Sequence, residues 1–342
     1  MRAAIAATLF FLVSALAAPP AKSEGKGKAA PPTPAPPKAG IKTPGVQIPF
    51  DSLKAEAEIS VGSPGWITAG DAIFVPDKSK GLVVRIDPKT NKPLDPVAGL
   101  KQPCSGTVVA FGSLWIPDCG AQGLARFDTK NNKITTTLNF GAVDATMGLA
   151  ATLDSVWMIV DSKTTLERID PEENKVAGEL RLPAACNSVA FGENSLWVTC
   201  PSDPRLLRIN PATNLVDKRI EVAAGARSVA FGAGSVWVLC EKEGKVQRID
   251  PKTNKVVKTI DLMVPNAGGN LAFGAGFLWL TQTGFPLTRI DPETDKERVA
   301  QQFWGEGGGL VSVTANAIWL SNIGKDSVWR IDPKRVIATL AE

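Results

Sequence analysis

The amino-acid sequence predicts an all-β fold, a seven-bladed β-propeller of four-stranded antiparallel blades. The first observation is a repeat of about forty residues that occurs seven times. The second is that every copy carries an aromatic residue followed ten or eleven positions later by an arginine, and both series recur every 40 to 42 residues. The third is that short apolar runs alternate with turn residues inside each copy. Seven copies at this period are typical of a closed ring of blades.

Two residue series mark the repeat. The aromatic series consists of Phe74, Trp115, Trp157, Trp197, Trp237, Trp279 and Trp319. The arginine series, set in sequence close to Arg-Ile-Asp-Pro, consists of Arg85, Arg126, Arg168, Arg208, Arg248, Arg289 and Arg330.

The copy from Asn187 to Val222 shows how one repeat makes one blade. We expect four short strands, at Ser188–Phe191, Ser195–Thr199, Leu206–Ile209 and Leu215–Glu221. The turn at 192–194 is tight, and the turn at 210–214 has a proline that presets φ and an asparagine that tolerates positive φ. Near-continuous apolar strands predict a sheet that is covered on both faces.

The spacing also predicts what the aromatic residues face. With a two-residue turn in the first hairpin, the residues opposite them on the first strand are Ile67, Val108, Ala150, Ala190, Ala230, Ala272 and Ser312. Across the next hairpin each aromatic faces its arginine. We expect an aromatic–arginine stack in the six blades that share the eleven-residue spacing, worth roughly 0.5–1 kcal/mol each where exposed. Both series are therefore interpreted as structural, with each arginine paired to the Asp two residues on or to a neighbouring blade.

Closure of the ring has two candidate strands. Residues 55–61 precede the first repeat and have the pattern of an outer strand, and residues 335–340 follow the last one. We favour the N-terminal segment as the strand that joins the first and last blades. The other segment would then be an extra edge strand.

The chain divides into three predicted regions. Residues 1–17 form a signal peptide, with a positive start, an apolar run and a small-x-small cleavage pattern at Ala15–Ala17. An uncleaved anchor is the alternative for this run. Residues 18–50 are predicted to be a disordered Pro/Ala/Lys-rich linker, and residues 51–342 the propeller. The predicted location is periplasmic or secreted, with no membrane insertion of the mature chain.

The charge of the chain disfavours one class of partner. The net charge is +4 and is spread over alternating basic and acidic residues. No dense basic stripe carries interleaved aromatics, so we predict no nucleic-acid partner. The protein is expected to be a monomer.

Candidate binding residues lie where the repeats differ. Counting from each aromatic residue identifies positions that border one mouth of the central channel, and these positions vary between blades. The ligand-binding candidates there are Arg227, Asp118, Asp161, Glu241, Asn187, Asn270 and Gln282. Arg227 suits an anionic group, the carboxylates suit a cation or acid–base work, and the amides supply neutral hydrogen bonds. Glycines at 268–269 and in the run 305–309 would let backbone approach a ligand or simply form tight loops.

All five cysteines fall in the same zone. Cys104 and Cys119 are opposite in the predicted register, and Cys186 and Cys200 are one residue out of it. In an exported protein both pairs are disulfide candidates. Cys240 is left over, and we expect it to be free and buried, with a thiolate metal site as the alternative.

Segments 228–238 and 248–255 resemble the repeats of the YncE-like (YVTN) seven-bladed β-propellers, and also those of streptogramin B (virginiamycin B) lyases. The resemblance spans roughly residues 55–341. It implies, for the lyases, catalysis by a histidine base with a divalent metal. This chain contains no histidine and no tyrosine, so that role has no position to fall on. Ser-His-Asp and Cys-His nucleophiles are excluded for the same reason.

Three functions follow from these observations. The first is a binding or interaction module that takes a small molecule or a protein segment at the channel mouth. The second is a lyase or hydrolase that uses carboxylates and a divalent metal without histidine. The third is a surface protein whose loops contact partners. No cofactor is predicted, and a divalent metal belongs only to the second alternative.

Overall fold

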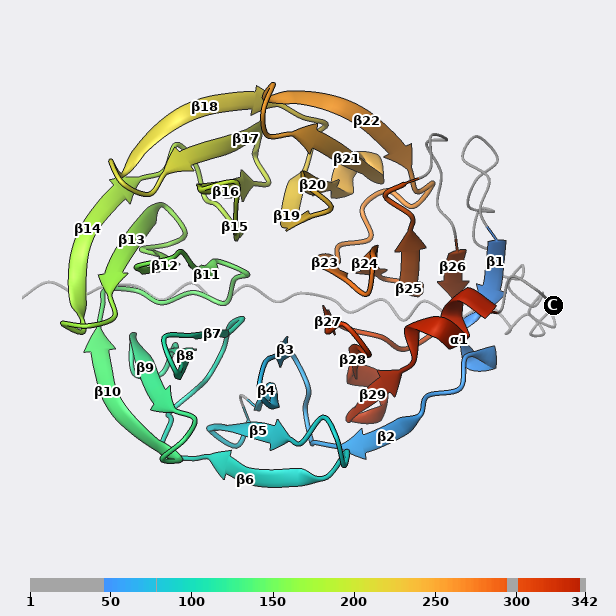
Figure 1. The fold of residues 1–342 in the computed structure, drawn as a ribbon, viewed down its shortest axis with the longest axis horizontal. Helices are drawn as coiled ribbons and strands as arrows, with labels where there is room; N and C mark the ends of the chain where they lie inside the picture. The colour runs from blue at the N-terminus through green and yellow to red at the C-terminus, as the bar shows by residue number, and fades with distance from the viewer. Residues whose placement is uncertain (1–45, 78, 294–300, 339–342) are drawn as a thin grey trace, which may run out of the picture. The chain divides into compact units, whose positions relative to one another are not determined.

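The computed structural model describes residues 46–77, 79–293 and 301–338. The strands in these ranges form seven sheets arranged as blades around a central axis; each blade has four antiparallel strands, and one carries an added fifth strand (Figure 1). This confirms the predicted propeller. The predicted signal peptide and residues 18–45 of the predicted linker lie outside the described residues.

The first four blades follow the chain without interruption. Their strands, in chain order, are β3 (Thr68–Ala69), β4 (Ile73–Asp77), β5 (Leu82–Ile86), β6 (Pro93–Val97), β7 (Val108–Ala110), β8 (Ser113–Asp118), β9 (Gly123–Asp128), β10 (Lys133–Asn139), β11 (Leu149–Ala151), β12 (Val156–Val160), β13 (Thr165–Asp170), β14 (Lys175–Arg181), β15 (Ser188–Gly192), β16 (Ser195–Cys200), β17 (Asp203–Asn210) and β18 (Leu215–Glu221).

Blades 5 to 7 include two strands from the start of the propeller, β1 (Val46–Pro49) and β2 (Ala57–Ser60). The other strands are β19 (Ala226–Gly232), β20 (Ser235–Cys240), β21 (Lys245–Asp250), β22 (Lys255–Asp261), β23 (Asn270–Gly274), β24 (Phe277–Gln282), β25 (Phe285–Ile290), β26 (Gln301–Trp304), β27 (Val311–Val313), β28 (Ile318–Asn322) and β29 (Ser327–Ile331). The described helices are the 3-10 turns η1 (Phe50–Ser52), η2 (Glu241–Glu243) and η3 (Ile323–Lys325), and α1 (Pro333–Ala338).

The N-terminal segment closes the ring, as predicted. Strand β2 pairs antiparallel with β29, with Ala57 opposite Arg330, and becomes the outer strand of blade 7. The prediction of a strand over residues 335–340 is wrong for its described part, which belongs to helix α1. Pro333 opens this helix and Asp332 accepts the Lys334 N–H at 2.8 Å, a favourable helix start.

The predicted disordered linker also extends too far. Residues 46–49 form β1, which lies parallel to β26 as a fifth strand of blade 6. The segment is held by the backbone ladder and by Gln47, which donates to Gln302 at 3.2 Å. Phe50 follows directly and is buried. Five residues of the predicted linker therefore belong to the propeller, because four of them form a strand and the fifth, Phe50, has a buried side chain.

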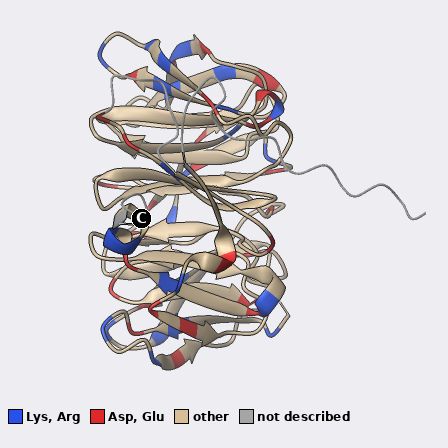
Figure 2. Cartoon of the chain, turned by 90° about the vertical axis from the view of Figure 1, so that its right-hand side faces the viewer, with Lys and Arg blue, Asp and Glu red and all other residues tan. Residues whose placement is uncertain are grey.

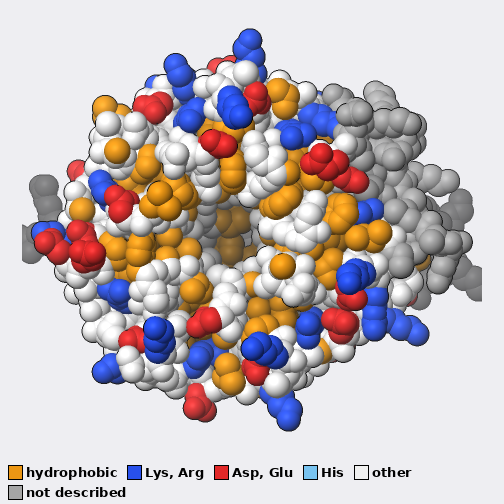
Figure 3. Space-filling view, viewed as in Figure 1, with side chains coloured by type: hydrophobic (Ala, Val, Ile, Leu, Met, Phe, Trp, Pro, Cys, Tyr) orange, Lys and Arg blue, Asp and Glu red, His pale blue; other side chains and the backbone are white. Residues whose placement is uncertain are grey.

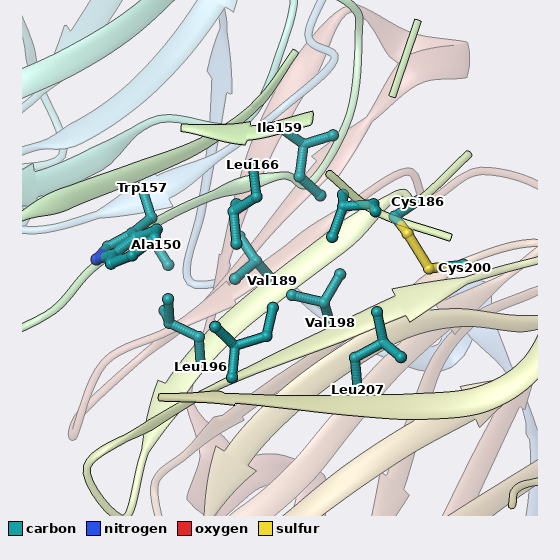
Figure 4. Packing of buried hydrophobic residues seen from close by; sticks show 12 residues of the cluster. Ala150, Trp157, Ile159, Leu166, Cys186, Val189, Leu196, Val198, Cys200 and Leu207 are labelled. Carbon is teal, nitrogen blue, oxygen red and sulfur yellow. A yellow bond between two sulfur atoms is a disulfide. The ribbon is translucent and has the colours of Figure 1, made fainter. Parts of the chain in front are cut away.

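Apolar side chains fill the space between adjacent blades. Figure 4 shows one such layer, in which Trp157 and Leu166 of blade 3 meet Val198 and Leu207 of blade 4. Since each blade of the ring packs against a neighbour on both faces, its middle strands are apolar at nearly every position. The function of the chain must therefore be sought at the strand ends, where side chains leave this packing.

The registers confirm the predicted partners of the aromatic residues in six blades, from Val108 opposite Trp115 to Ser312 opposite Trp319. Blade 1 differs, because Phe74 faces Thr68 and not Ile67. Its first hairpin turns over three residues, Gly70 to Ala72, and loop length sets strand register.

In five blades the arginine donates a hydrogen bond to the next blade, whereas Arg168 of blade 3 bonds to Asp154 and Ser155 of its own blade. In blade 4, Arg208 Nε donates to Ser195 Oγ at 2.9 Å and Arg208 Nη1 to the Pro251 carbonyl of blade 5 at 2.7 Å. The guanidinium also lies 5.1 Å from the Trp197 ring centroid. The structure thus favours the neighbouring-blade partner over the Asp two residues on. The same stack occurs in blades 2, 3, 5 and 7.

Blades 1 and 6 replace the stack with other rings. Arg85 lies over Phe127 of the next blade, where the other repeats have Ile, so the predicted stack on Phe74 is wrong. In blade 6, Arg289 lies 4.4 Å from the Phe277 centroid. Phe277 occupies the position at which blades 2 to 5 have the serine that accepts from the arginine.

Candidate functional site

A cavity of about 600 Å³ lies over the central axis of the ring. Its lining includes Trp66, Met147 and Arg227, which belong to blades 1, 3 and 5, so the cavity must sit where the blades converge. We call it the mouth cavity. The face of the ring drawn in Figure 3 is hollowed at its centre.

The positions counted from the repeat aromatics supply much of this lining. Ten residues before an aromatic stand Met147, Arg227, Gly269 and Gly309, and three or four residues after one stand Gln282, Thr283 and Ile323. Both predicted glycine clusters contribute as well. The places where the repeats differ in sequence therefore come together around one cavity.

Arg227 lines the cavity and pairs with Glu241. Arg227 stands near the start of β19, and its Nη1 is 3.3 Å from Glu241 Oε2 on η2. Its Nε donates to the Gly269 carbonyl at 3.3 Å. The Arg227 side chain remains 38% exposed. This geometry holds a guanidinium in a fixed direction while leaving part of it open to a ligand.

Gln282, at the end of β24, has one half of its amide engaged. Its Nε2 donates to the Val264 carbonyl at 3.2 Å, whereas its buried Oε1 has no hydrogen-bond partner in the described structure. A buried acceptor without a donor costs roughly 1–3 kcal/mol. A ligand or water donor that reached Gln282 Oε1 would recover that energy.

The other two predicted amides connect neighbouring blades. Asn270 accepts from Thr281 Oγ1 at 2.9 Å and from the Val311 N–H at 3.1 Å, and donates back to the Val311 carbonyl. Asn187 donates weakly to the Arg227 carbonyl at 3.4 Å. Their observed contacts are with the protein itself.

The predicted carboxylates of blades 2 and 3 are not part of the mouth-cavity lining. Asp118 is buried at the end of β8, where it accepts from the N–H groups of Lys101 and Gln102, both at 2.7 Å. Asp161 follows β12 with a positive φ of 53°. The structure therefore brings Arg227 and Gln282 to the cavity lining. Glu241 is linked to it only through its ion pair with Arg227, and Asp118 and Asp161 stay at the ends of strands β8 and β12 in their own blades.

Backbone geometry explains one of the glycines. Gly269 has φ +108°, and a Cβ there would lie 1.8 Å from the Thr281 carbonyl oxygen. Any other residue would clash with backbone and strain the turn. Glycine at this position is required by the close approach of the loop to β24, and it also leaves the cavity wall without a side chain.

Sequence reasoning missed Trp66 as a lining residue. Its indole N–H donates to the Cys104 carbonyl at 2.9 Å, which anchors the ring at the cavity. A signal was present in the sequence. Trp66, Trp304 and Trp329 are the three tryptophans outside the forty-residue series. The six repeat tryptophans are fully buried, whereas all three others line cavities.

The cysteines behave as predicted. Cys104–Cys119 and Cys186–Cys200 are disulfides, and Cys240 is free and buried. Burial, reinforced by the nearby Glu243 carboxylate, raises the pKa of the Cys240 thiol to about 12. A thiol in that environment is inert rather than nucleophilic.

Glu167, which is not part of the cavity lining, has a raised pKa. Burial raises the pKa of Glu167 to about 7, with further contributions from the charges of Asp161 and Glu179.

Within the described ranges, no group of three or more Cys, Asp or Glu residues is placed to hold a metal ion. Carboxylates and basic residues alternate over the side drawn in Figure 2. No helix in the described ranges is long and apolar enough to cross a membrane.

Comparison with known proteins shows similarity of fold. No family model and no curated protein matches the chain. Among solved structures, selenomethionine-substituted virginiamycin B lyase from Staphylococcus aureus superposes with a TM-score of 0.68 at 18% identity, over 80% of this chain and 97% of the lyase.

Two further structures give the same picture. A catalytically inactive variant of that lyase, in which a histidine is replaced by alanine, was solved with quinupristin; it has a TM-score of 0.68 at 17% identity over 80% and 97% of the two chains. Kuenenia stuttgartiensis hydrazine synthase has a TM-score of 0.66 at 14% identity over 81% and 97%. The chain is thus similar to virginiamycin B lyase-like seven-bladed propellers in fold.

Proposed function

We propose that the protein is a binding protein whose ligand, a small molecule or a protein segment, occupies the mouth cavity. The main support is that the cavity lies where the sequences of the repeats differ from one another. The cavity of about 600 Å³ is lined by residues from the mouth positions at which the repeats differ, and it lies within the size range of ligand pockets. An asymmetric ligand requires such an asymmetric lining.

The chemistry of the lining suggests what the ligand offers. Arg227 presents a partly open guanidinium that suits a carboxylate or phosphate. Gln282 Oε1 is an acceptor that lacks a donor. A ligand that carries both an anionic group and a hydrogen-bond donor would satisfy both. The two disulfides fit an oxidising compartment, which agrees with the proposed export of the chain.

Thermal-shift screening of the mature protein against metal ions and small metabolites tests the proposal. A ligand that prefers the folded state stabilises it by about 2.7 kcal/mol at one hundred times its Kd, so its melting temperature rises with concentration. Absence of any concentration-dependent shift across a broad set of probes would count against a small-molecule ligand.

A matched pair of variants then locates the site. Arg227→Ala should weaken a stabilising anionic ligand. Arg205→Ala is the control, because Arg205 is 40% exposed and paired with Asp203 at 2.7 Å, much like Arg227 but away from the cavity lining. Equal affinity in the two variants would contradict the mouth-cavity proposal.

The carboxylate-and-metal enzyme has no comparable observation in its favour. Glu167 has a raised pKa, which is a property of many functional acids, but it does not line the mouth cavity. We therefore do not extend the proposal to catalysis.

A further inference from the structure

A second cavity, of about 510 Å³, lies beside the mouth cavity between blades 6 and 7. We call it the side pocket. Its lining comes from three segments, residues 49–51, 304–307 and 322–329. Gly305, Glu306 and Gly307 line both cavities, so this short loop is the wall between them.

Aromatic rings form the apolar part of the side pocket. Phe50 and Trp329 stack with ring centroids 5.1 Å apart and planes at 12°. Both belong to the buried core between blades 6 and 7. Trp304 is different, because 39% of it is exposed. The pocket thus has a fixed aromatic base and one open indole at its edge, an arrangement that suits a ring-shaped ligand.

A buried amide adds an unused hydrogen-bond acceptor. Asn322 is only 1% exposed, and its Oδ1 has no hydrogen-bond partner in the described structure. The Cβ position of Gly307 would lie 3.2 Å from this oxygen. Because Gly307 has no side chain and a φ of +97°, a small movement of this loop would open the amide to a donor. A ligand hydroxyl there would remove the cost of the unpaired acceptor.

The rim of the pocket carries charges of both signs. Asp51 and Glu306 supply carboxylate acceptors, and Lys325 supplies an ammonium donor. The Lys325 Nζ lies 5.2 Å from the Trp329 ring centroid. The Trp329 face is therefore already next to a positive charge, which disfavours a ligand cation at the base of the pocket. The mixture of donors and acceptors favours a neutral ligand that can do both.

We propose that the side pocket binds a saccharide residue, with one face of the sugar ring on Trp304 and its hydroxyl groups on Asn322, Asp51 and Lys325. Hydroxyl groups donate and accept, which matches the mixed rim. The C–H face of a sugar ring matches an exposed indole. This site is separate from the proposed mouth ligand and does not depend on it.

A glycan microarray probed with the full chain tests the proposal, followed by isothermal titration of the brightest glycan. Trp304→Ala should weaken that glycan at least about tenfold, because it removes the indole on which the sugar ring lies. The control is Trp66→Ala, which alters a tryptophan of the mouth cavity and should leave glycan affinity unchanged. Thermal unfolding of each variant shows that it is folded.

Two further measurements separate a saccharide from a cation. Asp51→Asn keeps an acceptor oxygen at the rim but removes the negative charge. Because a neutral saccharide makes no ion pair with Asp51, glycan affinity should change less than about threefold. Choline chloride is the cationic probe, and no binding is expected. The proposal is overturned if no glycan binds above background, if Trp304→Ala and Trp66→Ala bind glycan equally, or if choline binds and Asp51→Asn abolishes that binding.

Discussion

Two of the repeat tryptophans provide a matched test of how the indole N–H contributes to the ring. Trp237 and Trp157 are both fully buried. Each faces an alanine across the first hairpin, and each lies beneath an arginine, at 5.3 and 5.9 Å from the ring centroid. They differ at the indole nitrogen. Trp237 Nε1 donates to the Gly232 carbonyl at 3.1 Å, whereas Trp157 Nε1 has no partner in the described structure.

Replacing each tryptophan by phenylalanine should therefore have different consequences. The lost ring volume is common to Trp237→Phe and Trp157→Phe and cancels in the comparison. Trp237→Phe also loses a hydrogen bond worth about 0.5–1.5 kcal/mol net, while Trp157→Phe removes an unpaired buried donor whose burial costs about 1–3 kcal/mol. Trp237→Phe should be the less stable variant by at least about 1 kcal/mol.

Guanidinium unfolding followed by circular dichroism measures this difference from the midpoints and slopes of the two transitions. Equal free energies of unfolding, or a larger loss in Trp157→Phe, would refute the assignment of the hydrogen bond as the difference between the two blades. A change in slope between the variants would show that the comparison does not report the native state alone.

Three other perturbations have definite expected outcomes. Replacing Cys186 and Cys200 together by alanine should lower the free energy of unfolding by about 2–4 kcal/mol, because the 14-residue separation is no longer cross-linked; a denaturation midpoint equal to that of the parent would contradict this. In the parent, stability should fall as pH rises from 4.5 to about 7, since folded Glu167 keeps a proton that the unfolded chain has released. Glu167→Gln should remove this fall, which is on the order of 1 kcal/mol once solvent screening is allowed for, and unchanged pH profiles would exclude Glu167 as its source. Ile59→Ala in the closing strand should cost about 2–4 kcal/mol, with exposed Ser60→Ala as a control of little effect; similar costs for both would argue against β2 as the closing strand.

Much of the ring could be predicted because its repeats impose one register on every blade. A two-residue turn fixes which residue faces each aromatic, and this holds in six blades. It fails at Phe74 because one extra loop residue at 70–72 shifts the strand by one position. It could not be anticipated that Phe127 and Phe277 would attract Arg85 and Arg289, since each phenylalanine replaces a residue of another type at its repeat position.

The candidate site was predictable only in part. Counting from the aromatic residues led to Arg227, Gln282 and the glycines, because strand ends in a ring converge on its axis. The side pocket was not predictable from that count. It depends on Phe50, which lies outside the seven repeats and was assigned to a linker, and on Trp304 and Trp329, which lie out of register. The tryptophans outside the repeat series were a signal that could have pointed to both cavities.

The most direct test of the central claim, that binding occurs where the repeats differ, is amide hydrogen exchange with and without a ligand found by thermal-shift screening. Ligand binding should slow exchange around Arg227 and in the loops at 267–269 and 305–309, which line the mouth cavity. Slowed exchange confined to the repeated turns at the outer rim, such as residues 210–214 and 250–254, would contradict the account.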